Sequence, residues 1–238
     1  REPYASDLQG LDYIRKARAE RAQQYFSANA NIWADIRSLY VPEQDVESVL
    51  LKRAEAGAGD KLLDVGTGTA RMLELFAPHV SEGLGLDISP EMLGAARDNL
   101  SREGFAHIQF RRGDMYEMDL EAASQTIVLY HQVLHYAEDP ARAIAEGARV
   151  LAAKGRFIIA DFAPHKEESL RLEHAHRRLG FHDWELEAWA ATSGLKPLST
   201  DVLGGGQLTV KVWTFEKLDS PAVVPLPNRQ TSSKNEVA

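Results

Sequence analysis

The chain has 238 residues, enough for one large domain or for a domain with a small appendage. Its 27 lysines and arginines against 35 aspartates and glutamates leave a net charge of −8, which argues against a dedicated nucleic-acid groove. Because the chain has no cysteine, disulfides, zinc–thiolate sites and thiol nucleophiles are excluded. No apolar stretch approaches the ~20 residues of a membrane span, and no secretory signal is present, so we expect a cytoplasmic protein.

The first part of the chain, residues 1–56, is predicted to be helical. Leu8, Leu11 and Ile14 fall on one stripe, with basic residues at the other positions. A further helix is expected at 43–55, before a glycine-containing loop. The apolar stripe fits either pairing with a second copy or packing on the chain's own core, so a homodimer stays open.

Short β-rich runs then alternate with helical segments. Strands are predicted at 61–65, 83–87, 107–111, 126–130 and 156–161, and helices at 69–78, 90–103 and 140–151. This alternation predicts an α/β fold with a parallel sheet and helices on both faces. A late run, 207–215, alternates apolar and polar residues and predicts an added antiparallel strand. Residues 218–238, with three prolines and a polar end, are expected to be disordered.

A glycine turn follows the first predicted strand and opens a helix. In this geometry the backbone N–H groups of Gly66, Thr67 and Gly68 can approach a ligand closely. Asp87 ends the next strand, where a carboxylate can accept both hydroxyls of a ribose. Asp114 ends the third strand, where it could accept from the amine of an adenine. An NAD site is the alternative, but threonines in place of a fuller glycine pattern suit a ligand without phosphates better.

These motifs resemble the class I S-adenosylmethionine-dependent methyltransferases. The resemblance covers roughly residues 20–215 and includes Asp64-x-Gly66-x-Gly68, the segments 87–93 and 113–115, and the turn at 149–155. It implies a Rossmann-like, doubly wound, seven-stranded, mostly parallel sheet with a helical N-terminal lid, and S-adenosylmethionine as cofactor. The cofactor-binding residues that it implies are Asp64, Gly66, Thr67, Gly68, Asp87, Ile88, Met92, Gly113, Asp114, Met115 and His131. Ile88 and Met115 would hold the adenine ring between them.

Two aromatic residues of the first segment also resemble a family feature. Tyr25 and Trp33 match the lid helix of small-molecule methyltransferases, where aromatic side chains close over the methionine end of the cofactor. A sulfonium near an aromatic face is attracted by ~0.5–2 kcal/mol. The alternative is that both residues only fasten the lid to the core.

Histidines follow the fourth and fifth predicted strands. His135 is predicted to act as general base and Tyr136 to face the substrate, because the loop after strand four lies at the carboxyl edge of the sheet. Alternatively, His135 only hydrogen-bonds to a neighbouring loop. On a predicted amphipathic helix, His174 and His176 would point in nearly opposite directions, so no metal site is expected. Its histidines and arginines would line the acceptor pocket or bridge to Asp161.

A narrower resemblance, to the methyltransferase-like C-terminal domain of ArsR-type transcriptional regulators, rests on the lid and histidine segments together. It implies a connector and lid at 1–56, a cofactor-binding domain at 57–217 and a tail at 218–238. Two functions follow. The chain is a methyltransferase acting on a small molecule, or it senses S-adenosylmethionine or S-adenosylhomocysteine for a fused winged-helix domain. DNA would then be bound by that other domain and not by this chain.

Overall fold

The computed structural model describes residues 25, 28, 42–101, 105–204 and 207–219. Trp33, the apolar stripe near the start of the chain and the tail from residue 220 onward lie outside the described residues, so the predictions made for them stay predictions. No helix in these ranges is long and apolar enough to cross a membrane.

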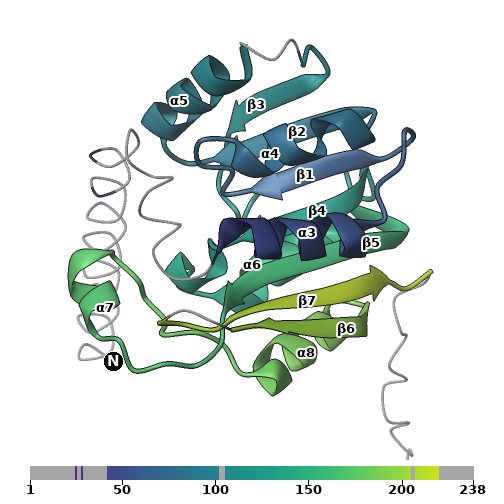
Figure 1. Ribbon diagram of the computed structural model, residues 1–238. Coiled ribbons are helices and arrows are strands. Elements are labelled where there is room, and N and C mark those ends of the chain that lie inside the picture. Colours follow the sequence, from purple (N-terminus) through teal and green to yellow (C-terminus); the bar gives the residue numbers. More distant parts are fainter. Residues whose placement is uncertain (1–24, 26–27, 29–41, 102–104, 205–206, 220–238) are drawn as a thin grey trace, which may run out of the picture.

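A single seven-stranded sheet forms the centre of the fold (Figure 1). Its strands are β1 (Lys61–Val65), β2 (Glu82–Asp87), β3 (Ile108–Arg112), β4 (Gln125–His131), β5 (Leu151–Phe162), β6 (Leu195–Leu203) and β7 (Val210–Lys217). They lie in the order β3-β2-β1-β4-β5-β7-β6. The strands β1 to β5 are parallel, and β7 is antiparallel to both β5 and β6. The predicted doubly wound, mostly parallel fold is confirmed.

The helices cover both faces of this sheet. They are α3 (Glu43–Ala54), α4 (Arg71–Phe76), α5 (Pro90–Ser101), α6 (Pro140–Val150), α7 (Ser169–Glu173) and α8 (Asp183–Thr192), with short 3-10 turns η2 (Ala77–His79) and η3 (Leu134–Tyr136). Successive strand residues point to opposite faces, so Leu62 packs in one core cluster with α3, α4 and α5, whereas Leu63 packs in the other with α6 and α8. Both clusters are almost fully buried, as expected for a parallel sheet between two helical layers.

The segment around His174 departs from the prediction. The expected amphipathic helix there is wrong, because α7 ends at Glu173 and the chain continues without helix through Phe181. Ala175 and Gly180 both have positive φ, 58° and 85°, and so turn the chain away from a helical path. The orientation of His174 and His176 therefore cannot be argued from helical geometry. The strand β6 and the helix α8 were not predicted.

The strand order places a topological switch point between β1 and β4 at the carboxyl edge of the sheet. The strand β1 lies between β2 and β4, and the connections after β1 and β4 lead to helices on opposite faces. In such sheets ligands bind at this switch point. The two loops touch, because a Cβ placed on Gly66 would overlap the Val133 side chain. In Figure 1 the arrowhead of β1 points to the side of the molecule where α7 lies.

Candidate active site at the carboxyl edge of the sheet

The glycine turn after β1 is fastened to β2 by its own backbone. Gly66 and Gly68 have φ of 71° and 54°, in the left-handed region that favours glycine. The amides of Gly66 and Thr67 donate to the carbonyl of Leu86 at 2.7 and 3.0 Å. The Thr67 hydroxyl donates to the buried Asp64 carboxylate at 2.6 Å. The turn is thus held in one conformation, with no side chain on either glycine.

Asp87 lies at the end of β2, beside this turn. Its two carboxylate oxygens accept hydrogen bonds from the amides of Gly68 and Ser89, each at 2.9 Å. Burial raises the pKa of the Asp87 carboxyl above its ordinary value, and the amides of Ser89, Gly68 and Ile88 oppose that shift. Each carboxylate oxygen can accept more than one hydrogen bond. The arrangement therefore fits a ligand with two neighbouring hydroxyls, such as a ribose.

The loop after β3 carries the residues predicted to bind adenine. The Asp114 carboxylate accepts from the amide of Tyr116 at 3.0 Å, which closes a short turn. On the neighbouring strand end, Ile88 is 46% exposed, so its side chain is free to cover a flat ring. Met115 is half-buried against the core. Met92, by contrast, is one of the buried residues of α5.

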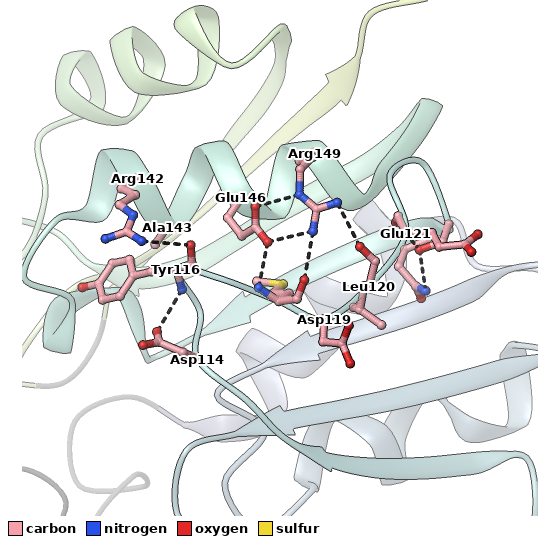
Figure 2. Close-up of polar contacts among 12 residues, drawn as sticks. Asp114, Tyr116, Asp119, Leu120, Glu121, Arg142, Ala143, Glu146 and Arg149 are labelled. Carbon is pink, nitrogen blue, oxygen red and sulfur yellow. Dashed lines mark hydrogen bonds and ion pairs between the residues drawn. The ribbon is translucent and has the colours of Figure 1, made fainter.

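The same loop is fixed to α6 by an arginine (Figure 2). Arg149 donates to the carbonyls of Met118 and Leu120 at 3.0 and 2.9 Å and pairs with Glu146 at 2.8 Å. Glu146 in turn accepts from the amide of Met118 at 2.7 Å. The Arg149 guanidinium lowers the pKa of Glu146, which stays ionised. The sequence singled out Arg149 only as part of a motif, and nothing in the sequence indicated these contacts.

Tyr116 joins the loop after β3 to the loop after β4. Its hydroxyl accepts from the amides of Glu138 and Asp139 at 2.7 and 3.2 Å, and the Arg142 guanidinium lies 5.3 Å from the centre of its ring. Figure 2 shows Tyr116 between Arg142 and Asp114. Burial raises the pKa of Tyr116, so the phenol keeps its proton. No motif in the sequence pointed to Tyr116.

His135 forms a buried pair with Asp161 from the end of β5. The Nδ1 atom of His135 lies 2.8 Å from Oδ1 of Asp161, and the backbone amide of His135 donates to Oδ2 at 3.1 Å. The two side chains are 2% and 0% exposed. One of the two predictions for the histidines and arginines near position 174 was that they bridge to Asp161. In the structure Asp161 contacts His135.

Further rings surround His135. His176 stacks on it at a centroid distance of 4.0 Å, and Tyr136 and Phe162 lie at 4.1 and 5.3 Å. His165 lies edge-on to Phe162 at 5.8 Å. Burial, and then the neighbouring imidazole of His135, lower the pKa of His176 and of His165, so both rings stay neutral. We call these five residues the histidine cluster.

Two further predicted residues are Tyr25 and His131. The Tyr25 hydroxyl is 2.7 Å from Nδ1 of His174, and the two rings meet edge to face. This contact joins Tyr25 to the segment that follows α7. His131 ends β4 and is buried. Within the described ranges, no three histidine, aspartate or glutamate side chains are grouped so as to hold a metal ion.

Comparison with known proteins identifies the central part of the chain. Residues 63–159 match the family model described as a methyltransferase domain. This segment is a methyltransferase domain. It contains the glycine turn, Asp87, Asp114 and His135, and the cofactor that such domains use is S-adenosylmethionine. The fit of Asp87 to a ribose agrees with that cofactor.

Curated relatives of the methyltransferase domain carry several activities. The chain is 30% identical over 140 residues to an uncharacterized methyltransferase, YcgJ, of Bacillus subtilis, covering 58% of this chain and 54% of that protein. It is 32% identical over 138 residues to the ubiquinone biosynthesis O-methyltransferase of Acinetobacter baylyi, covering 56% and 58%. It is 29% identical over 111 residues to the arsenite methyltransferase of Halobacterium salinarum, covering 45% and 28%. The chain thus spans about half the length of the curated relatives, or less.

Solved structures share the fold. The crystal structure of YcgJ from Bacillus subtilis has a TM-score of 0.65 at 19% identity, covering 74% of this chain and 100% of that one. The geranyl diphosphate C-methyltransferase of Streptomyces coelicolor has a TM-score of 0.65 at 14% identity, covering 74% and 78%. At these identities the likeness is one of fold.

Proposed function

We propose that the chain binds S-adenosylmethionine at the carboxyl edge of the sheet and transfers its methyl group to a small molecule. The observation that carries the proposal is Asp87. Its carboxylate is held by the amides of Gly68 and Ser89 directly beside a glycine turn, and so presents acceptors to a ribose where the backbone approaches most closely. Gly66 and Gly68 would then lie under the methionyl part of the cofactor.

The adenine would lie between Ile88 and Met115. In this arrangement Asp114 accepts from the exocyclic amine, and Gly113 lets the loop pack closely on Leu86, whose side chain an added Cβ would overlap. The carboxylate of Asp64 keeps Thr67 in place through its hydrogen bond. We assign Met92 to packing under this part of the site and His131 to the cofactor side of β4.

The acceptor would bind on the other side, at the loop after β4. His135 and Tyr136 are our candidate catalytic residues there, and Tyr25, through His174, closes that side. The methyl group of a sulfonium is already activated, so alignment and exclusion of water are the protein's main tasks. Relatives named as an arsenite methyltransferase and as a ubiquinone biosynthesis O-methyltransferase support a small acceptor.

Calorimetric titration with S-adenosylmethionine and with S-adenosylhomocysteine tests the cofactor site. Asp87→Ala is expected to weaken both affinities about 10- to 100-fold, because polar groups lose a buried partner worth ~1–3 kcal/mol. The matched control is Asp98→Ala on the exposed face of α5, which should bind as the wild type does. Unchanged binding by the Asp87 variant would refute the ribose assignment.

We also propose that the chain works within an ArsR-type regulator. The support is the sequence resemblance of the lid and histidine segments. In that setting a second copy pairs with it, and a separate winged-helix domain contacts DNA. Slow turnover of bound S-adenosylmethionine would mark the enzyme, whereas tight S-adenosylhomocysteine binding without turnover would mark the sensor. DNA binding and sedimentation of the full-length protein, with and without each ligand, test the regulator; an unchanged DNA affinity argues against it.

A further inference from the structure

Ala70 ends the glycine turn in a backbone conformation that is unfavourable for alanine. Its φ and ψ are 70° and 23°, in the left-handed region, although the residue carries a Cβ. An L-residue is disfavoured there by about 5- to 30-fold in population, whereas glycine adopts left-handed and right-handed conformations about equally. The residue is fully buried and directly precedes α4. Contacts made by its neighbours must therefore keep this backbone in place.

Two other helices contact the chain on either side of Ala70. From α5, the Nδ2 atom of Asn99 donates to the carbonyl of Thr69 at 3.1 Å. From α3, the carboxylate of Glu47 accepts from Nε and Nη2 of Arg71 at 2.6 and 2.8 Å. Since Thr69 precedes Ala70 and Arg71 follows it, both neighbours of the strained residue are held from outside the turn.

The contact between Glu47 and Arg71 is the stronger of the two. Both carboxylate oxygens bond to the guanidinium, an arrangement that we call a fork and that arginine and carboxylate groups favour. The Glu47 side chain is 8% exposed and that of Arg71 is 35% exposed, so solvent screens the pair only in part. Arg71 is the first residue of α4, which lies on the same face of the sheet as α3 (Figure 1). The fork therefore fixes the start of α4 relative to α3.

A second fork joins α3 to the sheet at a place away from the glycine turn. Arg53 donates through Nε and Nη2 to the carboxylate of Asp201 on β6, each at 2.7 Å. The two side chains are 31% and 24% exposed. The strand β6 is an edge strand, separated from β1 by β4, β5 and β7. Both forks thus anchor the same helix, but of the two only the Glu47 fork reaches a residue next to the turn.

We propose that Glu47, acting through Arg71, is a positioning residue that keeps the glycine turn in the conformation that binds the cofactor. The proposal rests on the proposed function, in which Gly66 and Gly68 lie under the methionyl part of S-adenosylmethionine. Without the fork, the backbone at Ala70 leaves the left-handed region in part of the molecules, and only the remaining fraction binds. The apparent affinity falls by that fraction, although the complex itself keeps its contacts.

Calorimetric titration with S-adenosylhomocysteine compares the two forks of α3. We expect Glu47→Gln to weaken binding about 5- to 10-fold, because the bias against left-handed alanine is then opposed only by the remaining contacts. The matched control is Asp201→Asn, which breaks the equivalent fork on the same helix and should bind within about 2-fold of the wild type. Unchanged binding by the Glu47 variant, or an equal loss in both variants, would overturn the proposal.

Ala70→Gly distinguishes positioning of the turn from general support of the fold. A glycine at this position adopts the left-handed conformation without the fork, so Glu47→Gln in the Ala70→Gly background should weaken binding less than about 2-fold. If the fork only stabilises the fold, the loss of affinity will be the same in both backgrounds, and the proposal fails. Arg71→Lys keeps the charge but not the fork and is expected to give an intermediate loss, which provides the same comparison if Glu47→Gln does not fold.

Titration of the wild type distinguishes a failure of the proposed function from a failure of this role. A wild type that binds neither S-adenosylmethionine nor S-adenosylhomocysteine overturns the proposed function and the role of Glu47 with it. A wild type that binds both ligands, together with a Glu47 variant of equal affinity, overturns the role of Glu47 alone and leaves the ribose assignment of Asp87 standing.

Discussion

Gly66 is a residue at which the backbone of the candidate site tolerates little change. Its φ of 71° lies where side chains are strained, and a Cβ there would overlap Val133 on the loop after β4. The same small residue therefore serves both the turn and the packing of two loops. A substitution cannot be absorbed by a flexible side chain, because Val133 is β-branched and stiff.

Gly66→Ala is expected to lower the free energy of unfolding by about 1–3 kcal/mol and to weaken S-adenosylmethionine binding. Urea unfolding and calorimetry measure the two effects. The same chemical change at Gly94, inside α5 with nothing within 4 Å of the added Cβ, should stabilise the protein by ~0.5–1 kcal/mol. Equal effects at both sites would contradict the argument from close packing.

At the scale of elements, α6 supports the loop after β3. Arg149 and Glu146 hold the backbone at Met118 and Leu120, and Arg142 lies over Tyr116 (Figure 2). The same helix directly follows the loop that carries His135, and Tyr116 connects the two loops through the amides of Glu138 and Asp139. The loops after β3 and β4 are thus positioned by shared contacts.

Arg149→Met is expected to release the loop without unfolding the domain. The guanidinium is partly exposed, so its ion pair is screened by solvent and the loss of stability should be about 1 kcal/mol. Hydrogen exchange at Met118 and Leu120 should speed up, and S-adenosylmethionine affinity should fall a few-fold. Arg171→Met, on the exposed face of α7, is the control. Unchanged exchange at Met118 would show that the arginine does not hold the loop.

How far the sequence predicts these elements depends on whether the signal is local. The strands β1 to β5 and the glycine turn were predicted, because apolar runs and turn residues are readable within a few positions. The strand β6 was missed since its residues are mostly exposed and it contains Pro197, which is typical of an edge strand. The helix expected at His174 failed because Ala175 and Gly180 turn the backbone.

The residues of the candidate site also differ in whether a local sequence signal predicts their positions. Asp87 and Asp114 follow strand ends directly, so their positions could be inferred from the order of strands. The pairing of His135 with Asp161 depends on the register of β4 against β5, in which His131 lies opposite Ala160. The position of Tyr116 depends on the hydrogen bond that its hydroxyl accepts from the amide of Glu138, 22 residues further along the chain. Such contacts follow from tertiary packing, and no local pattern encodes them.

At the scale of the whole molecule, the buried imidazoles link stability to pH. Burial lowers the pKa of His176 and of His165 in the folded chain. In the unfolded chain the same histidines have the ordinary pKa of about 6.5. Below that pH the unfolded state binds more protons than the folded state. Stability is therefore complete above the unfolded pKa and is lost as the pH falls, by up to ~1.4 kcal/mol per pH unit for each group.

Urea unfolding should accordingly show a falling free energy between about pH 7 and pH 5.5. His176→Phe keeps a ring against His135 but removes the titrating group, and is expected to flatten this dependence. Between about pH 7 and pH 8 the two proteins should have parallel profiles, because histidines are neutral there in both states. An equal slope for both proteins below pH 7 would place the origin of any acid sensitivity outside the histidine cluster, since the stacked ring of His176 is its most strongly affected member.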